Sequence, residues 1–273
     1  MGKFLAAAVQ IDSQGDKQEN LAKIEKLIDE AAGRGAKLVG LPEMMNYIGD
    51  EAGEQANAES ITGPTIQRLM KKARQHSLWL HCGSIFERIP GDNKLYNTTV
   101  LLDPQGEIAA SYRKIHLFDV EVMNGPSALE SRTKKPGREI VVVPTGLAKI
   151  GLSICYDLRF PEIYRIMALR GTEVFFVPAE FTLFTGKDHW ETLLRARAIE
   201  NQCYVIAPAQ IGVKPRFQTY GKSMIVDPWG NVIAKSSDQE GIILAEIDLA
   251  LLYRIRAQIP GLKNRKPESY QWE

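Results

Sequence analysis

The chain has 273 residues, 44% hydrophobic and 25% charged, a composition that excludes disordered and fibrous classes and suits a globular protein with a large core. Its 34 Lys and Arg residues and 33 Asp and Glu residues leave a formal net charge of +1, so no overall field attracts nucleic acid or an anionic membrane, and a small-molecule partner is expected. The sequence shows no secretory signal and no apolar run of about 18 residues, and its three cysteines are an odd number. It therefore predicts a cytoplasmic protein with reduced thiols and no membrane association.

Strands and helices alternate in the first half of the chain. Leu21, Ile24 and Ile28 recur at helical spacing in one amphipathic segment, which Gly33 and Gly35 end. The apolar runs around it have the length and composition of buried strands. The predicted elements, in chain order, are strand 3–11, helix 19–32, strand 36–41, helix 64–76 and strands 78–87 and 95–103. This order is typical of an α/β fold.

The second half repeats the order of the first. Residues 35–44 (GAKLVGLPEM) are echoed by 171–181 (GTEVFFVPAEF), and 100–111 (VLLDPQGEIAAS) by 224–236 (MIVDPWGNVIAKS). Each Asp-Pro-x-Gly of the second pair is a turn that predicts a hairpin. If each half forms one sheet with helices on one face, the repeat predicts two stacked mixed sheets with outer helices, a four-layer α-β-β-α sandwich. The elements predicted here are strand 148–154, helix 161–170, strand 172–180, helix 188–200, strand 201–212 and hairpin 222–236.

Two segments show little periodicity. Residues 121–138 contain two prolines and two glycines and are predicted to form a long loop, which inside a compact domain is often functional. We expect one domain at 1–253, followed by a basic tail at 254–273 that cannot make its own core. Because this tail contains Tyr270 and Trp272, we expect it to dock on a second subunit, in a homodimer or a larger homo-oligomer.

One cysteine stands where a nucleophile would be presented. Cys155 lies between a predicted strand and a helix that Pro161 suits as a first-turn residue, and a helix N-terminus favours the thiolate. The alternative is a buried structural cysteine, which is how Cys82 and Cys203, inside apolar strands, are interpreted.

Glu43 and Lys114 complete a set that could cleave an amide. Alone, Glu43 at a strand end is a solvated carboxylate, and Lys114 beside Arg113 is a surface cation. Together with Cys155 they supply the nucleophile, the base that takes the thiol proton, and the cation for the tetrahedral oxyanion. A Cys-His pair remains open, although His76, His81, His116 and His189 lie in no segment that clearly presents them.

Three short segments resemble the signatures of nitrilase-like carbon-nitrogen hydrolases, in the order of that family. They are LPEMMNY around Glu43, YRKIHLFDVE around Lys114 and GLSICYDLRFPE around Cys155, and the similarity covers nearly the whole chain. The resemblance implies the four-layer sandwich and a Glu-Lys-Cys triad, with a second glutamate that matches Glu130. Without the resemblance, Glu130 is one more loop carboxylate.

The mechanism that this resemblance implies needs no metal and no cofactor, and no Cys/His cluster of the sequence has ligand spacing. Glu43 deprotonates Cys155, which attacks the carbonyl, while Lys114 and the backbone N–H of Tyr156 stabilise the oxyanion. The amine leaves, and Glu43 then activates water to hydrolyse the thioester.

The residues after Cys155 separate branches of the family. Nitrilases tend to have Trp-Glu there, whereas Tyr156-Asp157 favours an amidase. The chain is most similar to the branch of deaminated-glutathione amidase and omega-amidase, whose substrates carry an α-keto carboxylate. Arg159 is predicted to bind that carboxylate, the alternative being an ion pair with Asp157 or Glu162, and Phe181 and Thr185 are predicted to line the pocket.

The expected reaction is therefore thiol-dependent hydrolysis of a small carboxylate-bearing amide, in the first place deaminated glutathione to 2-oxoglutarate and Cys-Gly, a metabolite repair. The alternatives are an omega-amidase acting on 2-oxoglutaramate, and a carbamoyl or nitrile hydrolase. Two alternatives of other classes are an interaction scaffold, which would have a disrupted triad, and a redox-sensing thiol protein, which would want a resolving cysteine near Cys155.

Overall fold

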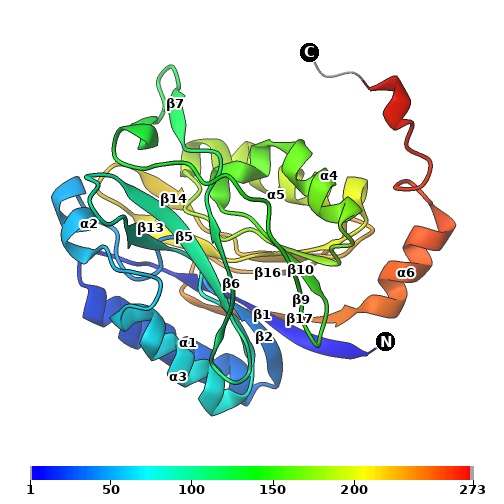
Figure 1. The fold of residues 1–273 in the computed structure, drawn as a ribbon, viewed down its shortest axis with the longest axis horizontal. Coiled ribbons are helices and arrows are strands. Elements are labelled where there is room, and N and C mark those ends of the chain that lie inside the picture. Colours follow the sequence, from blue (N-terminus) through cyan, green and yellow to red (C-terminus); the bar gives the residue numbers. More distant parts are fainter. Residues whose placement is uncertain (1, 271–273) are drawn as a thin grey trace.

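A computed structural model describes residues 2–270 and shows an α/β fold in four layers (Figure 1). Helices α1 (Lys17–Gly33) and α3 (Pro64–His76) cover the outer face of one sheet, and α4 (Pro161–Leu169) and α5 (Leu183–Asn201) cover the outer face of the other. The predicted α-β-β-α sandwich is thereby confirmed.

The first sheet has nine strands, in the order β14-β13-β1-β2-β3-β5-β4, and β17 also pairs with β1 and β6 with β5. β1 is parallel to β2 and to β13 and antiparallel to β17, so this sheet is mixed. Its strands are β1 (Lys3–Ile11), β2 (Ala36–Gly40), β3 (Trp79–His81), β4 (Ile85–Arg88), β5 (Leu95–Leu102), β6 (Ile108–Arg113), β13 (Ala209–Val213), β14 (Gln218–Tyr220) and β17 (Gly241–Asp248).

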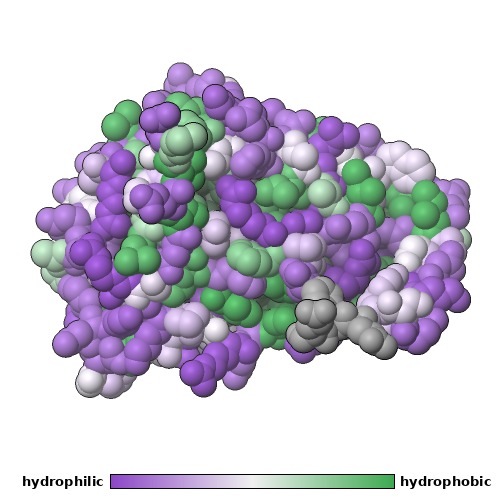
Figure 2. Space-filling model, turned by 90° about the horizontal axis from the view of Figure 1, so that it is seen from above, coloured by the Kyte–Doolittle hydropathy of each residue, from purple (hydrophilic) through white to green (hydrophobic). Residues whose placement is uncertain are grey.

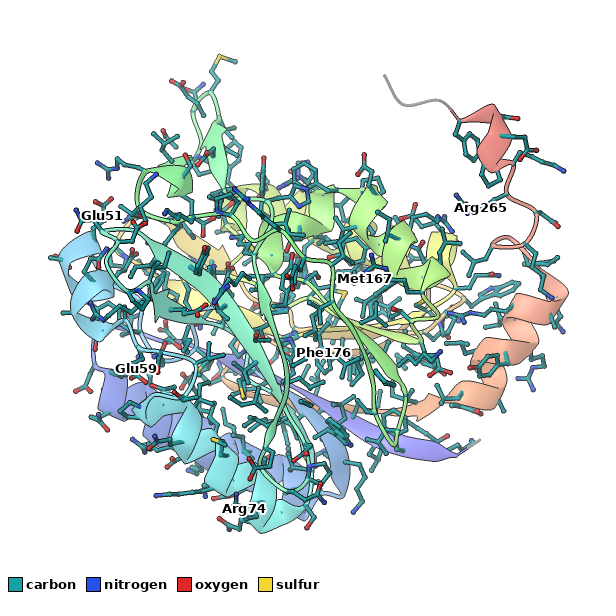
Figure 3. The ribbon with its side chains drawn as sticks, viewed as in Figure 1. Glu51, Glu59, Arg74, Met167, Phe176 and Arg265 are labelled. Carbon is teal, nitrogen blue, oxygen red and sulfur yellow. The ribbon has the colours of Figure 1, made fainter. Side chains whose placement is uncertain are left out.

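The second sheet has six strands, in the order β16-β15-β12-β11-β10-β9. Between the sheets, the ring of Phe176 stacks on that of His81 with 4.3 Å between centroids, and Figure 3 shows Phe176 in the middle of the body. The strands are β9 (Val142–Pro144), β10 (Lys149–Leu152), β11 (Val174–Phe176), β12 (Tyr204–Ala207), β15 (Met224–Val226) and β16 (Val232–Lys235).

The prediction of one sheet for each half of the chain is wrong in one respect. Strands β13, β14 and β17 come from the second half but belong to the nine-stranded sheet. The exchange begins at Pro208, which divides the predicted strand 201–212 into β12 in one sheet and β13 in the other. Proline cannot donate to a strand ladder, so it suits the point where the chain changes sheets.

Two other predicted elements have different bounds. The strand predicted at 78–87 is broken into β3 and β4 at Gly83, whose φ is +56° and where a Cβ would lie 2.0 Å from the carbonyl oxygen of Pro42. The helix predicted at 188–200 begins five residues earlier, at Leu183, because the Thr182 side chain accepts from the Thr185 N–H and caps it. Both Asp-Pro-x-Gly segments are antiparallel hairpins, as predicted.

The segment 121–138 is not a structureless loop. It belongs to a hairpin of β7 (Asp119–Glu121) and β8 (Ser127–Leu129), followed by the 3₁₀ turn η1 (Glu130–Arg132). The hairpin projects from the body (Figure 1), and hydrophobic residues interrupt the hydrophilic surface of the face from which it rises (Figure 2). Its Met123 and Leu129 are exposed.

The C-terminal segment begins as a helix. α6 (Leu249–Gln258) continues across residue 253, with Leu252 and Ile255 buried against the body. The chain then leads away from the body through η3 (Pro267–Ser269) (Figure 1). Tyr270 is exposed, and Trp272 lies outside the described residues. From residue 2 to residue 270, no helix is both long and apolar enough to cross a membrane.

Candidate active site

Four side chains predicted from the sequence meet in one place. Glu43 follows β2, Lys114 follows β6, Cys155 follows β10, and Glu130 begins η1 after the projecting hairpin. Lys114 lies in the middle, with its Nζ 3.0 Å from Glu43 Oε1 and 3.0 Å from Glu130 Oε2. The structure therefore brings together one thiol, one ammonium and two carboxylates from four separate parts of the chain.

Lys114 is a buried cation, with 2% of its side chain exposed, held by two anions. Burial by itself would lower the pKa of Lys114, but the charges of Glu130, Glu43 and Cys155 outweigh it and hold that pKa well above its ordinary value. The ammonium is a permanent positive charge beside the thiol, which is what an oxyanion site requires.

Glu43 receives hydrogen bonds on both carboxylate oxygens. Besides Lys114, the side-chain nitrogen of Asn97 donates to Oε1 over 2.9 Å, and the backbone N–H of Glu180 donates to Oε2 over 2.7 Å. These three donors satisfy both carboxylate oxygens and fix the plane of the carboxylate. The main chain is held as well, because Gln210 Nε2 donates to the carbonyl of Glu43 over 2.9 Å.

Glu130 is anchored from the other side. Its Oε2 accepts from the Phe118 N–H over 2.6 Å and from Lys114, and its Oε1 accepts from Asn97 over 3.4 Å. Burial alone would raise the pKa of Glu130, but Lys114 and these donors lower it below its ordinary value. Glu130 is therefore an anion that holds Lys114 in place.

Asn97 was not singled out in the sequence, although it joins the two glutamates. It lies on β5, is almost fully buried, and its one amide nitrogen contacts both Glu43 and Glu130. Asn97 lies in a run of three polar residues, with Thr98 and Thr99, inside the strand 95–102, and periodicity does not distinguish an active-site residue there from a core residue.

Cys155 stands in a sharp turn at the base of the cleft. Its φ is +46°, its N–H donates to the carbonyl of Pro178 over 2.9 Å, and it opens the 3₁₀ segment η2 (Cys155–Arg159). A left-handed conformation is uncommon for a residue with a side chain, and strained turns of this kind cluster at functional sites.

The expectation that a helix N-terminus favours the thiolate of Cys155 is wrong. α4 begins only at Pro161, and burial first, then the charge of Glu43, raise the pKa of Cys155 well above its ordinary value, against the opposing effect of Lys114. The thiol is protonated near neutral pH and needs a base. Burial also raises the pKa of Cys82, and it raises the pKa of Cys203 to about 12; both thiols lie in the apolar core.

Tyr156 and Asp157 shape the turn around the thiol. The backbone N–H of Tyr156 has no acceptor among residues 2–270, whereas the Asp157 carboxylate is buried and accepts from the Ile154 N–H over 2.9 Å. Tyr112 and His116 also donate to Asp157, over 2.6 and 2.8 Å. Asp157 is thus a structural anchor, and the free N–H of Tyr156 is available to a ligand.

A small cleft opens above Cys155, and it contains the residues predicted to bind substrate. Its lining comprises Phe118, Cys155, Tyr156, Arg159, Glu180, Phe181, Thr182 and Thr185. Thr185 lines the cleft from the first turn of α5, which begins at Leu183 and not at residue 188 as predicted.

Arg159 extends over this cleft, with its guanidinium 5.0 Å from the centroid of the Phe181 ring. Its Nη1 lies 3.1 Å from Nδ1 of His189, and within the described chain it forms no salt bridge. The alternative of an ion pair with Asp157 or Glu162 is therefore contradicted. The structure places a cation without a salt-bridge partner in the same cleft as Cys155.

Glu180 is a second residue that was not singled out. It lines the cleft at the end of the segment 171–181, in which the sequence echoes the segment that carries Glu43. Burial first, and the charge of Glu43 second, raise the pKa of Glu180 to about 8. The internal repeat could have pointed to it, since both echoed segments carry a glutamate after a proline.

The remaining polar groups suggest neither a Cys-His pair nor a metal centre. His116 stacks on Phe160 at 3.6 Å and His81 on Phe176 at 4.3 Å, and none of the four histidines hydrogen-bonds to Cys155 within residues 2–270. Over that same range, no group of three His, Cys, Asp or Glu side chains could hold a metal ion.

Comparison with known proteins gives a consistent result. The family model described as "Carbon-nitrogen hydrolase" matches residues 5–257. A deaminated glutathione amidase of Synechocystis is 44% identical over 97% of this chain and 99% of its own length, and the mouse omega-amidase NIT2 is 40% identical over 100% and 99%. The crystal structure of the C. elegans NitFhit protein superposes with a TM-score of 0.93 at 38% identity, covering 99% of this chain and 67% of that one.

Proposed function

The chain belongs to the carbon-nitrogen hydrolase family, and we propose that it hydrolyses a small carboxylate-bearing amide through a thioester on Cys155. The preferred substrate is deaminated glutathione, which would be cleaved to 2-oxoglutarate and Cys-Gly in a metabolite repair reaction. The observation that carries this proposal is the placement of Lys114 between Glu43 and Glu130 in the site that holds the protonated thiol of Cys155.

The first half of the reaction forms the thioester. Glu43 takes the thiol proton, and the sulfur of Cys155 adds to the amide carbonyl. The ammonium of Lys114 and the free N–H of Tyr156 stabilise the negative oxygen of the tetrahedral intermediate. The C–N bond then breaks, and Glu43 returns the proton to the leaving amine.

The second half restores the enzyme. Water enters where the amine has left, Glu43 takes its proton, and the hydroxide adds to the thioester carbonyl. The C–S bond breaks, the thiolate of Cys155 recovers the proton from Glu43, and the carboxylic acid product leaves. Glu130 takes no proton in this scheme, because its ion pair with Lys114 and the N–H of Phe118 stabilise its charge.

The acyl side of the substrate is assigned to the rim of the cleft. Arg159 offers a planar guanidinium without an acidic partner in the described chain, and such a group pairs well with a carboxylate. Phe181 supports the guanidinium from one side, and Thr185 adds a hydroxyl in the same cleft. These three residues are proposed to bind the 2-oxo carboxylate end.

An omega-amidase acting on 2-oxoglutaramate is the second candidate, and the mouse relative supports it. Both substrates contain the same 2-oxoglutaryl acyl group, and they differ in the amine that leaves, Cys-Gly or ammonia. The residues around Arg159 would therefore bind both in the same way, and the leaving-group side decides between them.

We also propose that the protein acts as a homodimer or a larger homo-oligomer. The exposed aromatic and aliphatic side chains of α6 and the segment after it, Tyr253, Ile259 and Tyr270, are of the kind that interfaces bury. Light scattering of the full chain would give the size, and a monomer at micromolar concentration would exclude the proposal.

The test of function compares deaminated glutathione and 2-oxoglutaramate side by side. We expect a higher kcat/KM for deaminated glutathione, loss of activity in Cys155→Ala, and retained activity in the matched control Cys82→Ala, whose thiol is buried in the core. A higher value for 2-oxoglutaramate would make the protein an omega-amidase. If the acyl group cannot be trapped on Cys155 by mass spectrometry with any amide, the thioester mechanism is wrong and a scaffold or redox role would have to be considered.

A further inference from the structure

Glu180 is a carboxyl that the proposed mechanism does not use, although it lines the same cleft as Cys155. Its backbone N–H donates to Glu43 over 2.7 Å, which fixes the main chain next to the base. Its side chain accepts no hydrogen bond and forms no salt bridge with any residue from 2 to 270. A half-buried glutamate that lines a cleft, and whose carboxyl has no partner in the described chain, needs an explanation.

The charges around Glu180 favour its neutral form. Burial and the nearby carboxylates of Glu43 and Glu54 raise its pKa to about 8, while Lys214 and Lys114 oppose this. Both cations already have partners: Lys214 Nζ lies 2.6 Å from Asp12 Oδ1, and Lys114 is shared by Glu43 and Glu130. The thiol of Cys155 is neutral, and the guanidinium of Arg159 contacts His189. Near neutral pH, Glu180 is therefore protonated and carries an O–H donor.

The position of this donor relates it to the substrate. Cys155, Glu180 and Arg159 line one cleft, so an acyl group bound between the sulfur and the guanidinium lies in the cleft that Glu180 lines. In a 2-oxo acid, the atom next to the carboxylate carries a carbonyl oxygen, which accepts a hydrogen bond. In the corresponding amino acid that position carries an ammonium, which can only donate.

We propose that Glu180 is a specificity-determining residue, whose neutral carboxyl donates a hydrogen bond to the 2-oxo oxygen of the substrate and disfavours an acyl group with an ammonium there. The inference rests on the proposed function, because it concerns the same 2-oxo acyl group. It gives the site a means to separate deaminated substrates from the abundant amino compounds of the same shape. Sites that hydrogen-bond one partner discriminate strongly against an analogue that leaves a buried polar group unpaired.

The discrimination depends on pH with a definite sign. As the pH rises through about 8, Glu180 loses its proton, the donor disappears, and the new negative charge repels the anionic 2-oxo acid while it attracts an ammonium. The preference for 2-oxo substrates therefore falls on the alkaline side.

The experiment uses two amides that differ only at this position, 2-oxoglutaramate and glutamine, with kcat/KM measured on either side of pH 8. The ratio of the two values should fall about tenfold in Glu180→Ala, because one hydrogen bond to a buried group is lost. Glu180→Gln retains an N–H donor and cannot titrate, so its ratio should stay within about threefold of wild type at neutral pH and should no longer change across pH 8. An unchanged ratio in Glu180→Ala, or a wild-type ratio that is flat across pH 8, would overturn the inference.

Binding without turnover separates this inference from the proposed function. Calorimetry on Cys155→Ala compares 2-oxoglutarate with glutamate, and then repeats the comparison with Glu180→Ala added. If the wild type hydrolyses neither 2-oxo amide, but Cys155→Ala prefers 2-oxoglutarate and the added substitution removes that preference, the proposed function fails and the inference stands. If the wild type hydrolyses the 2-oxo amides and Glu180→Ala changes neither ratio nor binding, only the inference fails.

Discussion

Two glutamates lie just beyond strands of the two sheets and differ in their partners. Glu43 follows β2 of the nine-stranded sheet and Glu180 follows β11 of the six-stranded sheet, each after a proline. Glu43 accepts three hydrogen bonds, one of them from the ammonium of Lys114. The Glu180 carboxyl accepts none within the described residues.

The difference shows that topology brings a carboxyl to the cleft, and that its donors then decide what the carboxyl can do. With Lys114, Asn97 and a backbone N–H donating to it, Glu43 is the carboxyl that we propose takes the proton of Cys155. Glu180, beside that carboxyl, holds its own proton and can donate it in a hydrogen bond. We therefore propose that the same residue type acts as a base in one half of the repeat and as a neutral acid in the other.

The largest effect is expected where the anion itself is removed. Glu43→Gln keeps the shape but cannot accept the thiol proton, so kcat/KM should fall by about a thousandfold or more, the range of general-base catalysis. The same change at Glu180 should lower the kcat/KM for 2-oxo amides less than about tenfold, because that carboxyl is not proposed to move a proton. Steady-state kinetics on the two variants measure the contrast, and equal losses would show that the two carboxyls are not distinct in role.

The next largest effect is expected where the cation is removed. Lys114→Met deletes one oxyanion donor, for a loss in kcat on the order of a hundredfold, and leaves two buried carboxylates without their charge partner, which costs about 3 kcal/mol of stability. Lys134→Met is the matched control, since Lys134 is equally buried and pairs with Glu54 over 2.6 Å outside the cleft. Denaturant unfolding should show comparable destabilisation for both. A comparable loss of kcat in Lys134→Met would mean that the Lys114 effect is only structural.

A smaller effect is expected at the rim. Arg159→Lys keeps the charge but loses the planar fork, so KM for 2-oxoglutaramate should rise about tenfold while kcat changes little. A neutral aliphatic amide of similar length is the control and should show no change in KM. A fall in kcat with both amides would instead place Arg159 among the groups that position Cys155.

Much of this site could be predicted from the sequence because it lies at the ends of strongly patterned elements. The helix Pro64–His76 and the strand Lys3–Ile11 have the predicted bounds, since their periodicity is local information. The transfer of the chain between sheets at Pro208 could not be predicted, because an apolar run has the same pattern in either sheet.

Asn97 and Glu180 were missed for a related reason. Each is a polar residue in or beside a buried strand, and its importance depends on what other strands bring next to it. The three family segments, in contrast, mark their residues along the chain. Pairing that joins distant segments, such as Asn97 with Glu43 and Glu130, has no local signature.

The smallest expected effect concerns stability. Glu180 and Glu130 should change the free energy of unfolding in opposite directions as the pH changes. The pKa of Glu180 is raised from 4.5 to about 8 in the folded protein, so between these values the folded state binds more protons than the unfolded state and stability is lost as the pH rises. Glu180→Gln removes this loss and should be more stable than wild type by about 1 kcal/mol at alkaline pH, with little difference near pH 4.5.

Glu130 is the matched control, because its pKa is lowered from 4.5 and its contribution is present above that value and lost as the pH falls. Glu130→Gln should therefore be less stable than wild type at neutral pH, with a deficit that shrinks in acid. Urea unfolding of the three proteins across this range measures both slopes, and the same sign for both variants would show that Glu180 is ionised and stabilised in the fold, contrary to its unpartnered position in the cleft.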